Sequence, residues 1–252
     1  MNTGAPASAG SSPKAGLTHC TPENVVSTIW LLDSGPGSAA FNMALDEALL
    51  ETAASRGRAV LRFYDWTEPA ASFGYFQKYA EVEALTPLRP LVRRPTAGGI
   101  VPHDADWTYS LVFPANHPWY ALRAAESYRG AHSWLQRAFS RLGLAVELAP
   151  CRCESQAGHC FIGYEQSDLL WHGRKIAGAA QRRTREGLLI QGSVQPPPVG
   201  LARTDWREAM RAAAPFDSPV QWLEFSPEPP LQKLALDLAA SKFALPAYNR
   251  KR

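Results

Sequence analysis

The stretch from Asp168 to Arg183, DLLWHGRKIAGAAQRR, predicts a β-hairpin and with it a sheet-containing fold. Two mainly apolar runs, 168–171 and 174–178, flank His172-Gly173, and a two-residue connection that contains glycine is typical of hairpins. Lys175 lies in the second run, although most basic residues of this chain are arginines. A half-buried ammonium needs a partner such as a carbonyl or phosphate oxygen. Lys175 is therefore a candidate functional residue.

Outward from this hairpin, strand and helix patterns alternate. Ser38 is a suitable N-cap for a helix that ends near Gly57, and Gly143 ends a second, longer helix. Apolar runs and alternations predict the strands, and strand 107–114 alternates as a half-buried strand does. We expect strands at 27–33, 59–66, 70–76, 107–114 and 187–194, a strand from 91 that runs into a glycine-bearing loop, a long helix at about 119–142, and two modest helices in the last fifty residues. The pattern predicts an α/β (α+β) fold: a single domain with a mixed, largely antiparallel sheet packed by helices.

The composition is that of an ordinary globular protein, with 46% hydrophobic and 19% charged residues among 252. A net charge of +3 without long runs of either sign gives no reason to expect nucleic acid or a membrane surface as partner. The basic tail 249–252 is most simply a solvated terminus. No segment approaches the ~20 apolar residues of a membrane span.

The first 25 residues are rich in Gly, Ala, Ser and Pro, which predicts a disordered leader at 1–25 and one domain at 26–252. This leader lacks the charged start and apolar run of a signal peptide. Four cysteines are too few for a disulfide framework in a chain of this length. We therefore expect a cytoplasmic protein with reduced thiols.

The segment RRPTAGGIVPHD, residues 93–104, joins two arginines to paired glycines. Glycines let a ligand lie against the main chain, and arginines can hold an anionic group. The segment is neither a Walker loop nor a dinucleotide fingerprint, and an ordinary turn between strands explains it equally well. His103 and Asp104 are adjacent, and neighbours on an extended chain point in opposite directions, so we do not expect a hydrogen-bonded pair between them.

Three cysteines lie just before the hairpin, at Cys151, Cys153 and Cys160. Their spacing does not match common structural zinc sites, so we expect no metal. A single cysteine is usually a small buried apolar residue. Cys160, however, precedes the hairpin that carries Lys175, and a nearby cation can lower the pKa of a thiol and activate it.

Taken in order, RRPTAGG with the following HD, TYSLVFP, CF, GRKIAGAAQRR and GSV resemble the lipoate–protein ligase and octanoyltransferase family, which shares its catalytic fold with biotin–protein ligases. The resemblance covers about residues 29 to 195. TYS after the HD, and CF fifteen residues before the lysine, are most similar to the cysteine-dependent octanoyltransferases. This resemblance implies transfer of an octanoyl group from acyl carrier protein, through a cysteine thioester, to the lysine of a lipoyl domain such as the glycine-cleavage H protein.

The resemblance also implies roles for individual residues. Cys160 would be the nucleophile that accepts the acyl group, and Lys175 would contact the acyl carbonyl. The acyl and carrier-arm pocket would be lined by Arg93, Arg94, Thr96, Gly98, Gly99, His103, Gly178 and Ala179. No cofactor is expected for this reaction. Two alternatives remain: an ATP- and Mg-dependent lipoate ligase, in which Arg93 and Arg94 would face a nucleotide phosphate, and a non-catalytic carrier-binding protein of the same fold.

Overall fold

The computed structural model describes residues 1–4, 27–153, 163–198, 200–216 and 219–252. Most of the predicted leader, 5–26, and the proposed nucleophile Cys160 lie outside these residues. Within the described part of the chain, no helix is long and apolar enough to cross a membrane.

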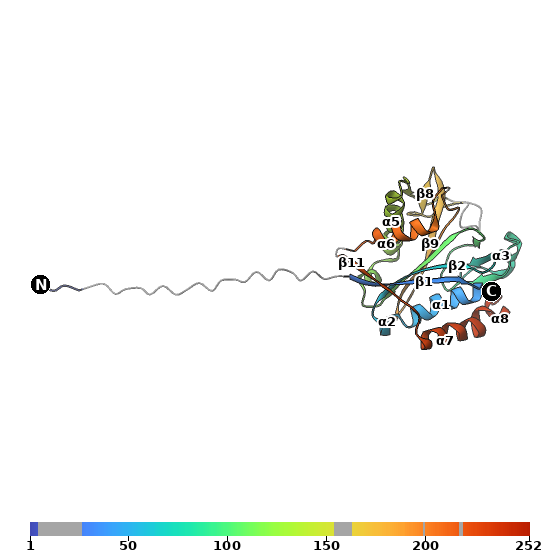
Figure 1. Ribbon diagram of the computed structural model, residues 1–252, viewed down its shortest axis with the longest axis horizontal. Coiled ribbons are helices and arrows are strands. Elements are labelled where there is room, and N and C mark those ends of the chain that lie inside the picture. Colours follow the sequence, from blue (N-terminus) through green and yellow to red (C-terminus); the bar gives the residue numbers. More distant parts are fainter. Residues whose placement is uncertain (5–26, 154–162, 199, 217–218) are drawn as a thin grey trace.

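The centre of the fold is an eight-stranded sheet in the order β11-β1-β2-β6-β10-β9-β8-β7 (Figure 1). β1 pairs in parallel with both β11 and β2, and the remaining neighbours are antiparallel. This confirms the predicted mixed, largely antiparallel sheet. The strands are β1 (Ser27–Gly37), β2 (Ala59–Trp66), β6 (Trp107–Pro114), β7 (Glu147–Leu148), β8 (Leu169–Trp171), β9 (Arg174–Thr184), β10 (Gly187–Val194) and β11 (Val220–Glu224).

A second, three-stranded sheet carries the glycine-bearing segment. Its order is β4-β3-β5, with β3 (Ala70–Phe73) parallel to β4 (Leu91–Arg93) and antiparallel to β5 (Val101–His103). The short helix α3 (Tyr79–Leu85) lies between β3 and β4 in the chain. This sheet places the end of β4, the paired glycines and His103 in one region.

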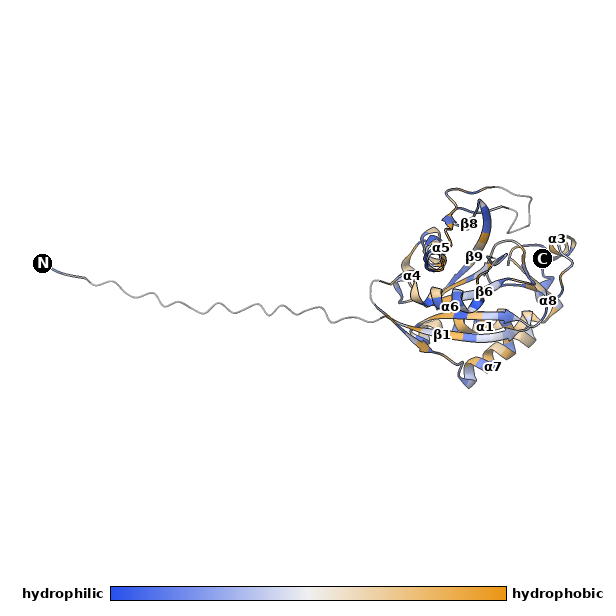
Figure 2. Cartoon of the chain, turned by 45° about the horizontal axis from the view of Figure 1, so that its top comes forward, coloured by the Kyte–Doolittle hydropathy of each residue, from blue (hydrophilic) through white to orange (hydrophobic). Residues whose placement is uncertain are grey.

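Helices cover both faces of the large sheet, as Figure 2 shows for α1 and α7 on one side and α5 on the other. The Oγ of Ser38 caps α1 by accepting from the Phe41 N–H at 3.3 Å, as its sequence predicts. Gly57 ends α2 with a φ of 64°. The helices are α1 (Ala39–Glu51), α2 (Ala53–Arg56), α4 (Pro118–Ala121), α5 (Ala124–Arg141), α6 (Arg203–Ala212), α7 (Pro229–Leu238), the π-helical segment η1 (Ala239–Phe243) and α8 (Pro246–Asn249).

Three sequence expectations about elements were wrong. Strand β6 is not half-buried but buried along its whole length, because Leu111 and Phe113 face the core under α5 while Val112 faces the core under α1. The long helix predicted at 119–142 is broken between α4 and α5. The last fifty residues contain strand β11 as well as helices, since a parallel pairing with β1 leaves little local signal.

Candidate active site

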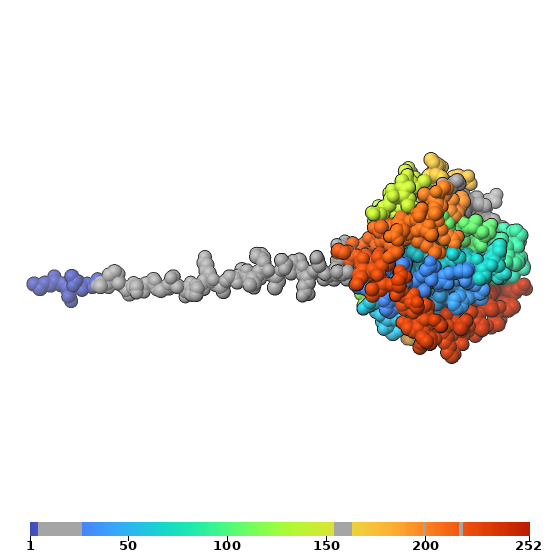
Figure 3. Space-filling model, in the orientation of Figure 1, coloured from blue at the N-terminus to red at the C-terminus, as the bar shows by residue number. Residues whose placement is uncertain are grey.

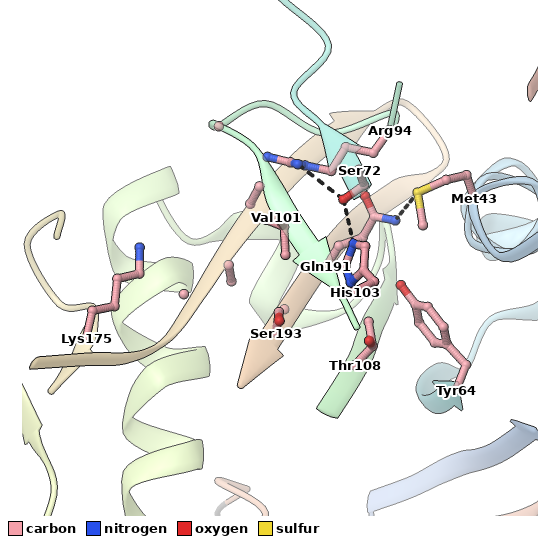
Figure 4. Close-up of a pocket in the computed structure, with 15 residues that line it drawn as sticks. Met43, Tyr64, Ser72, Arg94, Val101, His103, Thr108, Lys175, Gln191 and Ser193 are labelled. Carbon is pink, nitrogen blue, oxygen red and sulfur yellow. Dashed lines mark hydrogen bonds between the residues drawn. The ribbon is translucent and has the colours of Figure 1, made fainter. Parts of the chain in front are cut away.

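A pocket opens where the small sheet meets β9 and β10 of the large sheet (Figure 4). Its empty space, with the open solvent at its edge included, is about 480 Å³. β9 contributes Gly178, Ala179 and Ala180, whose small side chains leave the space open. Lys175 lies at one end of the pocket, and His103 lies toward the other.

At the first end, Lys175 is held by a carboxylate that the sequence did not reveal. Its Nζ lies 2.7 Å from Oδ2 of Asp168, and both side chains are buried. The same oxygen accepts from the Glu165 N–H at 2.8 Å, while Oδ1 accepts from the Tyr128 hydroxyl. Burial, and secondarily the charge of Asp168, raise the pKa of Tyr128, so it stays a hydrogen-bond donor. Asp168 therefore fixes the ammonium group at the wall of the pocket.

The hairpin geometry brings these two residues together. His172 and Gly173 have φ angles of 49° and 72°, the left-handed pair that a tight two-residue turn requires, and the predicted hairpin is confirmed. Gly178 then makes room for the lysine: a Cβ at this position would lie 2.7 Å from Cε and 2.8 Å from Nζ of Lys175. Any larger residue at 178 would push the ammonium away from its place.

Lys175 also borders a second cavity on the far side of the hairpin. Gly163, Tyr164, Arg174 and Gln195 line this cavity together with Lys175. Gly163 is three residues along the chain from Cys160. The described residues nearest in sequence to the proposed nucleophile thus lie beside the same cavity as Lys175.

At the other end of the pocket, His103 is held between two partners. Its Nδ1 lies 2.9 Å from Oδ2 of Asp106, and its Nε2 lies 2.8 Å from Oγ of Ser72. Trp66 stacks on the imidazole at 3.8 Å between ring centroids, with an interplanar angle of 17°. The expectation that His103 does not pair with Asp104 agrees with these partners. The sequence did not predict Asp106 or Ser72.

The Asp106 carboxylate, which accepts hydrogen bonds from several groups, determines the tautomer of His103. The Asp106 carboxylate also accepts from the hydroxyls of Thr108 (2.9 Å) and Ser193 (2.7 Å). Because a carboxylate oxygen only accepts, Nδ1 of His103 carries a hydrogen, and in the neutral ring Nε2 accepts from the Ser72 hydroxyl. Every polar group of this histidine therefore has a partner.

The two adjacent arginines have different surroundings. Arg94 lines the pocket: its Nη2 and Nε donate to the Ala97 carbonyl at 2.6 and 3.0 Å, and its Nη1 lies 3.4 Å from Ser72 Oγ. Gly98, with a φ of 93°, also lines the pocket, and a Cβ there would lie 2.7 Å from Nη2 of Arg94. Glycine at 98 thus permits both the turn and the position of the guanidinium.

Arg93 does not line this pocket, contrary to its predicted role. Its Nη1 donates to the carbonyls of Tyr75 and Gln77, both at 2.7 Å, and its Nη2 donates to the Asn249 carbonyl at 2.8 Å. The guanidinium also lies 4.7 Å above the Phe73 ring. Since successive residues at a strand end point in opposite directions, Arg94 faces the pocket and Arg93 joins the 75–77 loop to the C-terminal segment.

Thr96 and Gly99 also lie outside the residues that line the pocket. Thr96 is buried and donates from Oγ1 to Oε1 of Gln191 at 2.7 Å. Gln191 Nε2 in turn donates to Asp46 at 2.8 Å, and Asp46 forms a buried ion pair with Arg62 at 2.7 Å. Thr96 therefore anchors the glycine loop to the sheet. Of the site residues predicted from the sequence, six line the pocket: Arg94, Gly98, His103, Lys175, Gly178 and Ala179.

Cys151 and Cys153 are exposed free thiols near the cavity beside Tyr164. Among the residues that the structure describes, no group of three His, Cys, Asp or Glu side chains is arranged to hold a metal ion. Cys160 and His159 lie outside that set.

Known proteins of one family resemble this chain. The family model of the lipoyl protein ligase A/B catalytic domain matches residues 38–195, more than half of the chain, and the chain belongs to this family. Octanoyltransferase LipM of Anoxybacillus flavithermus is 37% identical over 181 residues, which are 66% of this chain and 65% of that protein. Octanoyltransferase LipM of Bacillus subtilis is 38% identical over 176 residues, 65% of this chain and 63% of that protein. The chain thus matches somewhat less than two thirds of the length of these relatives.

Solved structures show the same fold. Protein Ta0514 of T. acidophilum, solved with bound lipoic acid, has a TM-score of 0.72 at 19% identity and covers 90% of this chain and 100% of its own. A lipoate-protein ligase A bound with ATP has a TM-score of 0.71 at 19% identity, covering 89% of this chain and 98% of its own. The predicted fold of the lipoate ligase type is confirmed.

Proposed function

We propose that this protein transfers an octanoyl group from acyl carrier protein to the lysine of a lipoyl domain, such as that of the glycine-cleavage H protein. The observation that carries the proposal is the buried Lys175–Asp168 pair, held at 2.7 Å at the wall of a pocket in a member of the lipoyl ligase family. The relatives named octanoyltransferases, at 37 and 38% identity, support this activity over ligation.

In the first half-reaction, the Cys160 thiolate attacks the carbonyl carbon of the carrier-bound octanoyl thioester. The carbonyl oxygen becomes an oxyanion, and its collapse breaks the bond to the carrier sulfur, which leaves as a thiolate and takes up a proton. Lys175 donates an N–H to the oxyanion, because its ammonium already lies at the pocket wall. Asp168 orients the lysine and does not touch the acyl group.

In the second half-reaction, the amine of the acceptor lysine attacks the Cys160 thioester. A carbon–nitrogen bond forms, the carbon–sulfur bond breaks, and the nitrogen loses a proton as the amide is made. Lys175 again stabilises the oxyanion. The octanoyl chain lies along Gly178, Ala179 and Ala180, where the absence of large side chains leaves the pocket open.

An ATP-dependent lipoate ligase is the second candidate, because a solved neighbour of the same fold is bound with ATP. In that case Arg93 and Arg94 would face a nucleotide phosphate. The Arg93 donors are, however, directed to backbone carbonyls of residues 75, 77 and 249, which disfavours a phosphate contact. A non-catalytic carrier-binding protein is disfavoured by the buried, preorganised Lys175.

Intact-mass analysis after mixing with octanoyl–acyl carrier protein tests the proposal. We expect a hydroxylamine-labile adduct of one octanoyl mass on the wild type, no adduct on Cys160→Ala, and normal adduct formation on Cys151→Ser/Cys153→Ser. Formation of lipoyl-AMP from lipoate and ATP, without any adduct, would favour the ligase. Carrier binding without either reaction would favour the non-catalytic alternative.

A further inference from the structure

Three cations from two distant parts of the chain surround the ring of Tyr75, just outside the pocket. Lys251 Nζ lies 3.9 Å from the ring centroid, and the guanidinium carbons of Arg252 and Arg182 lie 5.6 and 6.0 Å from it. Arg252 also lies 5.3 Å from the ring centroid of Phe76, whose side chain is 66% exposed. We call Arg182, Lys251, Arg252, Tyr75 and Phe76 the basic cluster.

The positive charge of the basic cluster is only partly compensated. Arg182 shares the buried carboxylate of Glu47 with Lys242. Within the described chain, no Asp or Glu side chain forms an ion pair with Lys251 or Arg252, and both residues are exposed. A hydrogen bond from Lys251, together with the charges of Arg182 and Arg252, lowers the pKa of the Tyr75 phenol, as expected where positive charge is in excess.

The basic cluster adjoins the pocket from two directions. The Tyr75 N–H donates to the Thr96 carbonyl at 2.9 Å, at the start of the loop whose Gly98 lines the pocket. Arg182 is two residues beyond the pocket-lining Ala180 on β9, and residues two apart on a strand face the same side. A molecule bound to the basic cluster would therefore lie beside the glycine loop and β9, both of which line the pocket.

The basic cluster is held in place by hydrogen bonds to the chain around it. A main-chain oxygen of Arg252 accepts from the Tyr79 N–H at 2.9 Å, and the Asn249 carbonyl accepts from Arg93. Figure 3 shows the C-terminal segment, in red, against the teal surface of the segment that contains α3. Arg93, displaced from its predicted role in the pocket, thus fixes the backbone that presents these cations.

We propose that the basic cluster is the docking surface for an acidic face of the carrier protein that delivers the acyl group. This inference rests on the proposed function, since it concerns the donor of that reaction. A carrier must place its acyl-bearing arm in the pocket while its own surface rests on the rim, where carboxylates would pair with Lys251 and Arg252. Exposed cations of this kind increase the rate of encounter and lose their effect with added salt.

The test compares two donors that deliver the same acyl group. Octanoyl–acyl carrier protein carries a protein surface, whereas octanoyl-pantetheine is small and uncharged. For Lys251→Glu/Arg252→Glu we expect the KM for octanoyl–acyl carrier protein to rise about tenfold or more with little change in kcat. The rate with octanoyl-pantetheine should stay within about twofold of wild type. Arg129→Glu, an exposed arginine on α5, is the matched control and should change neither.

Further measurements separate the possible failures. Lys251→Arg/Arg252→Lys should keep the wild-type KM, and salt should weaken carrier use by the wild type more than by the charge-reversed variant. An unchanged KM for the carrier donor, or an equal loss with both donors, would overturn the docking surface. Direct binding of holo–acyl carrier protein supplies a readout without turnover: if the wild type transferred from neither donor yet bound the carrier in a charge-dependent way, the proposed function would fail and the docking surface would stand.

Discussion

The two ends of the pocket share one arrangement, a basic side chain held by a buried aspartate, but they differ in how the basic side chain is surrounded. Each has a buried aspartate that holds a basic side chain: Asp168 holds Lys175, and Asp106 holds His103. His103 has both nitrogens in hydrogen bonds and lies stacked against Trp66. Lys175 instead lies at the border of two cavities, with its ammonium positioned by Asp168. Chemistry is therefore expected at the lysine end and rigidity at the histidine end.

The largest expected effect is on the lysine end. Lys175→Arg should lower kcat about a hundredfold to a thousandfold, because the broader guanidinium cannot occupy the site beside Gly178 and still donate to the oxyanion. The melting temperature should change little, since a cation still faces Asp168. Single-turnover octanoyl transfer measures the effect. Wild-type turnover in this variant would mean that the lysine supplies only positive charge.

At the histidine end, Asp106→Ala should mainly lower the stability of the fold and affect transfer much less. Removing this carboxylate leaves the buried donors of His103, Thr108 and Ser193 without their acceptor, which costs roughly 2–4 kcal/mol of unfolding free energy. Urea unfolding measures the loss, and the folded fraction should keep transfer within about tenfold of wild type. A large loss of turnover at unchanged stability would place chemistry at this end as well.

Gly178→Ala refines the first prediction. The three atoms nearest to the added Cβ are Cε and Nζ at the flexible end of Lys175 and Oδ1 of Asp168, so we expect the lysine to shift while the fold persists. We expect a drop in kcat of about tenfold, equivalent to about 1.4 kcal/mol, and a near-normal melting temperature. A double-mutant cycle is the control: in a Lys175→Ala background, Gly178→Ala should have almost no further effect on kcat. Additive losses would show that Gly178 acts through something other than the lysine.

The smallest expected effect is on the pH dependence of the free energy of unfolding, through His132 on α5. His132 on α5 has Nδ1 3.0 Å from the Tyr128 carbonyl, and burial lowers its pKa. The native state then binds fewer protons than the unfolded chain, so stability is complete above about pH 6.5 and falls as the pH decreases. Between pH 6.5 and 5.5 this histidine accounts for at most about 1 kcal/mol.

His132→Phe should make the decline of unfolding free energy over that interval shallower, as urea titrations at several pH values would show. His117, whose pKa is also lowered by burial, keeps part of the slope in the variant. An unchanged slope would contradict the assignment of this titration to His132.

Local patterns predicted the parts of the site whose geometry is set by nearby residues. The hairpin at His172-Gly173 follows from its two-residue turn, and the start of α1 follows from the cap at Ser38. The ordered motifs also indicated the family and part of the pocket wall, including Arg94, Gly98, His103 and Lys175. These features depend on short-range backbone preferences and on order along the chain, which a sequence displays directly.

Only the tertiary structure showed which hydrogen-bond and ion-pair partners the polar residues of the site have. Asp168 lies close to Lys175 in the sequence, but nothing there distinguishes it from other aspartates until the hairpin closes. Arg93 and Arg94 are chemically the same, and only the folded structure shows that Arg93 meets the 75–77 loop and α8 while Arg94 lines the pocket. Ser72 meets His103 only after β3 pairs with β5. A buried polar group is satisfied by whichever donor or acceptor the fold brings within about 3 Å, and neither a distant nor a neighbouring partner can be recognised before the chain has folded.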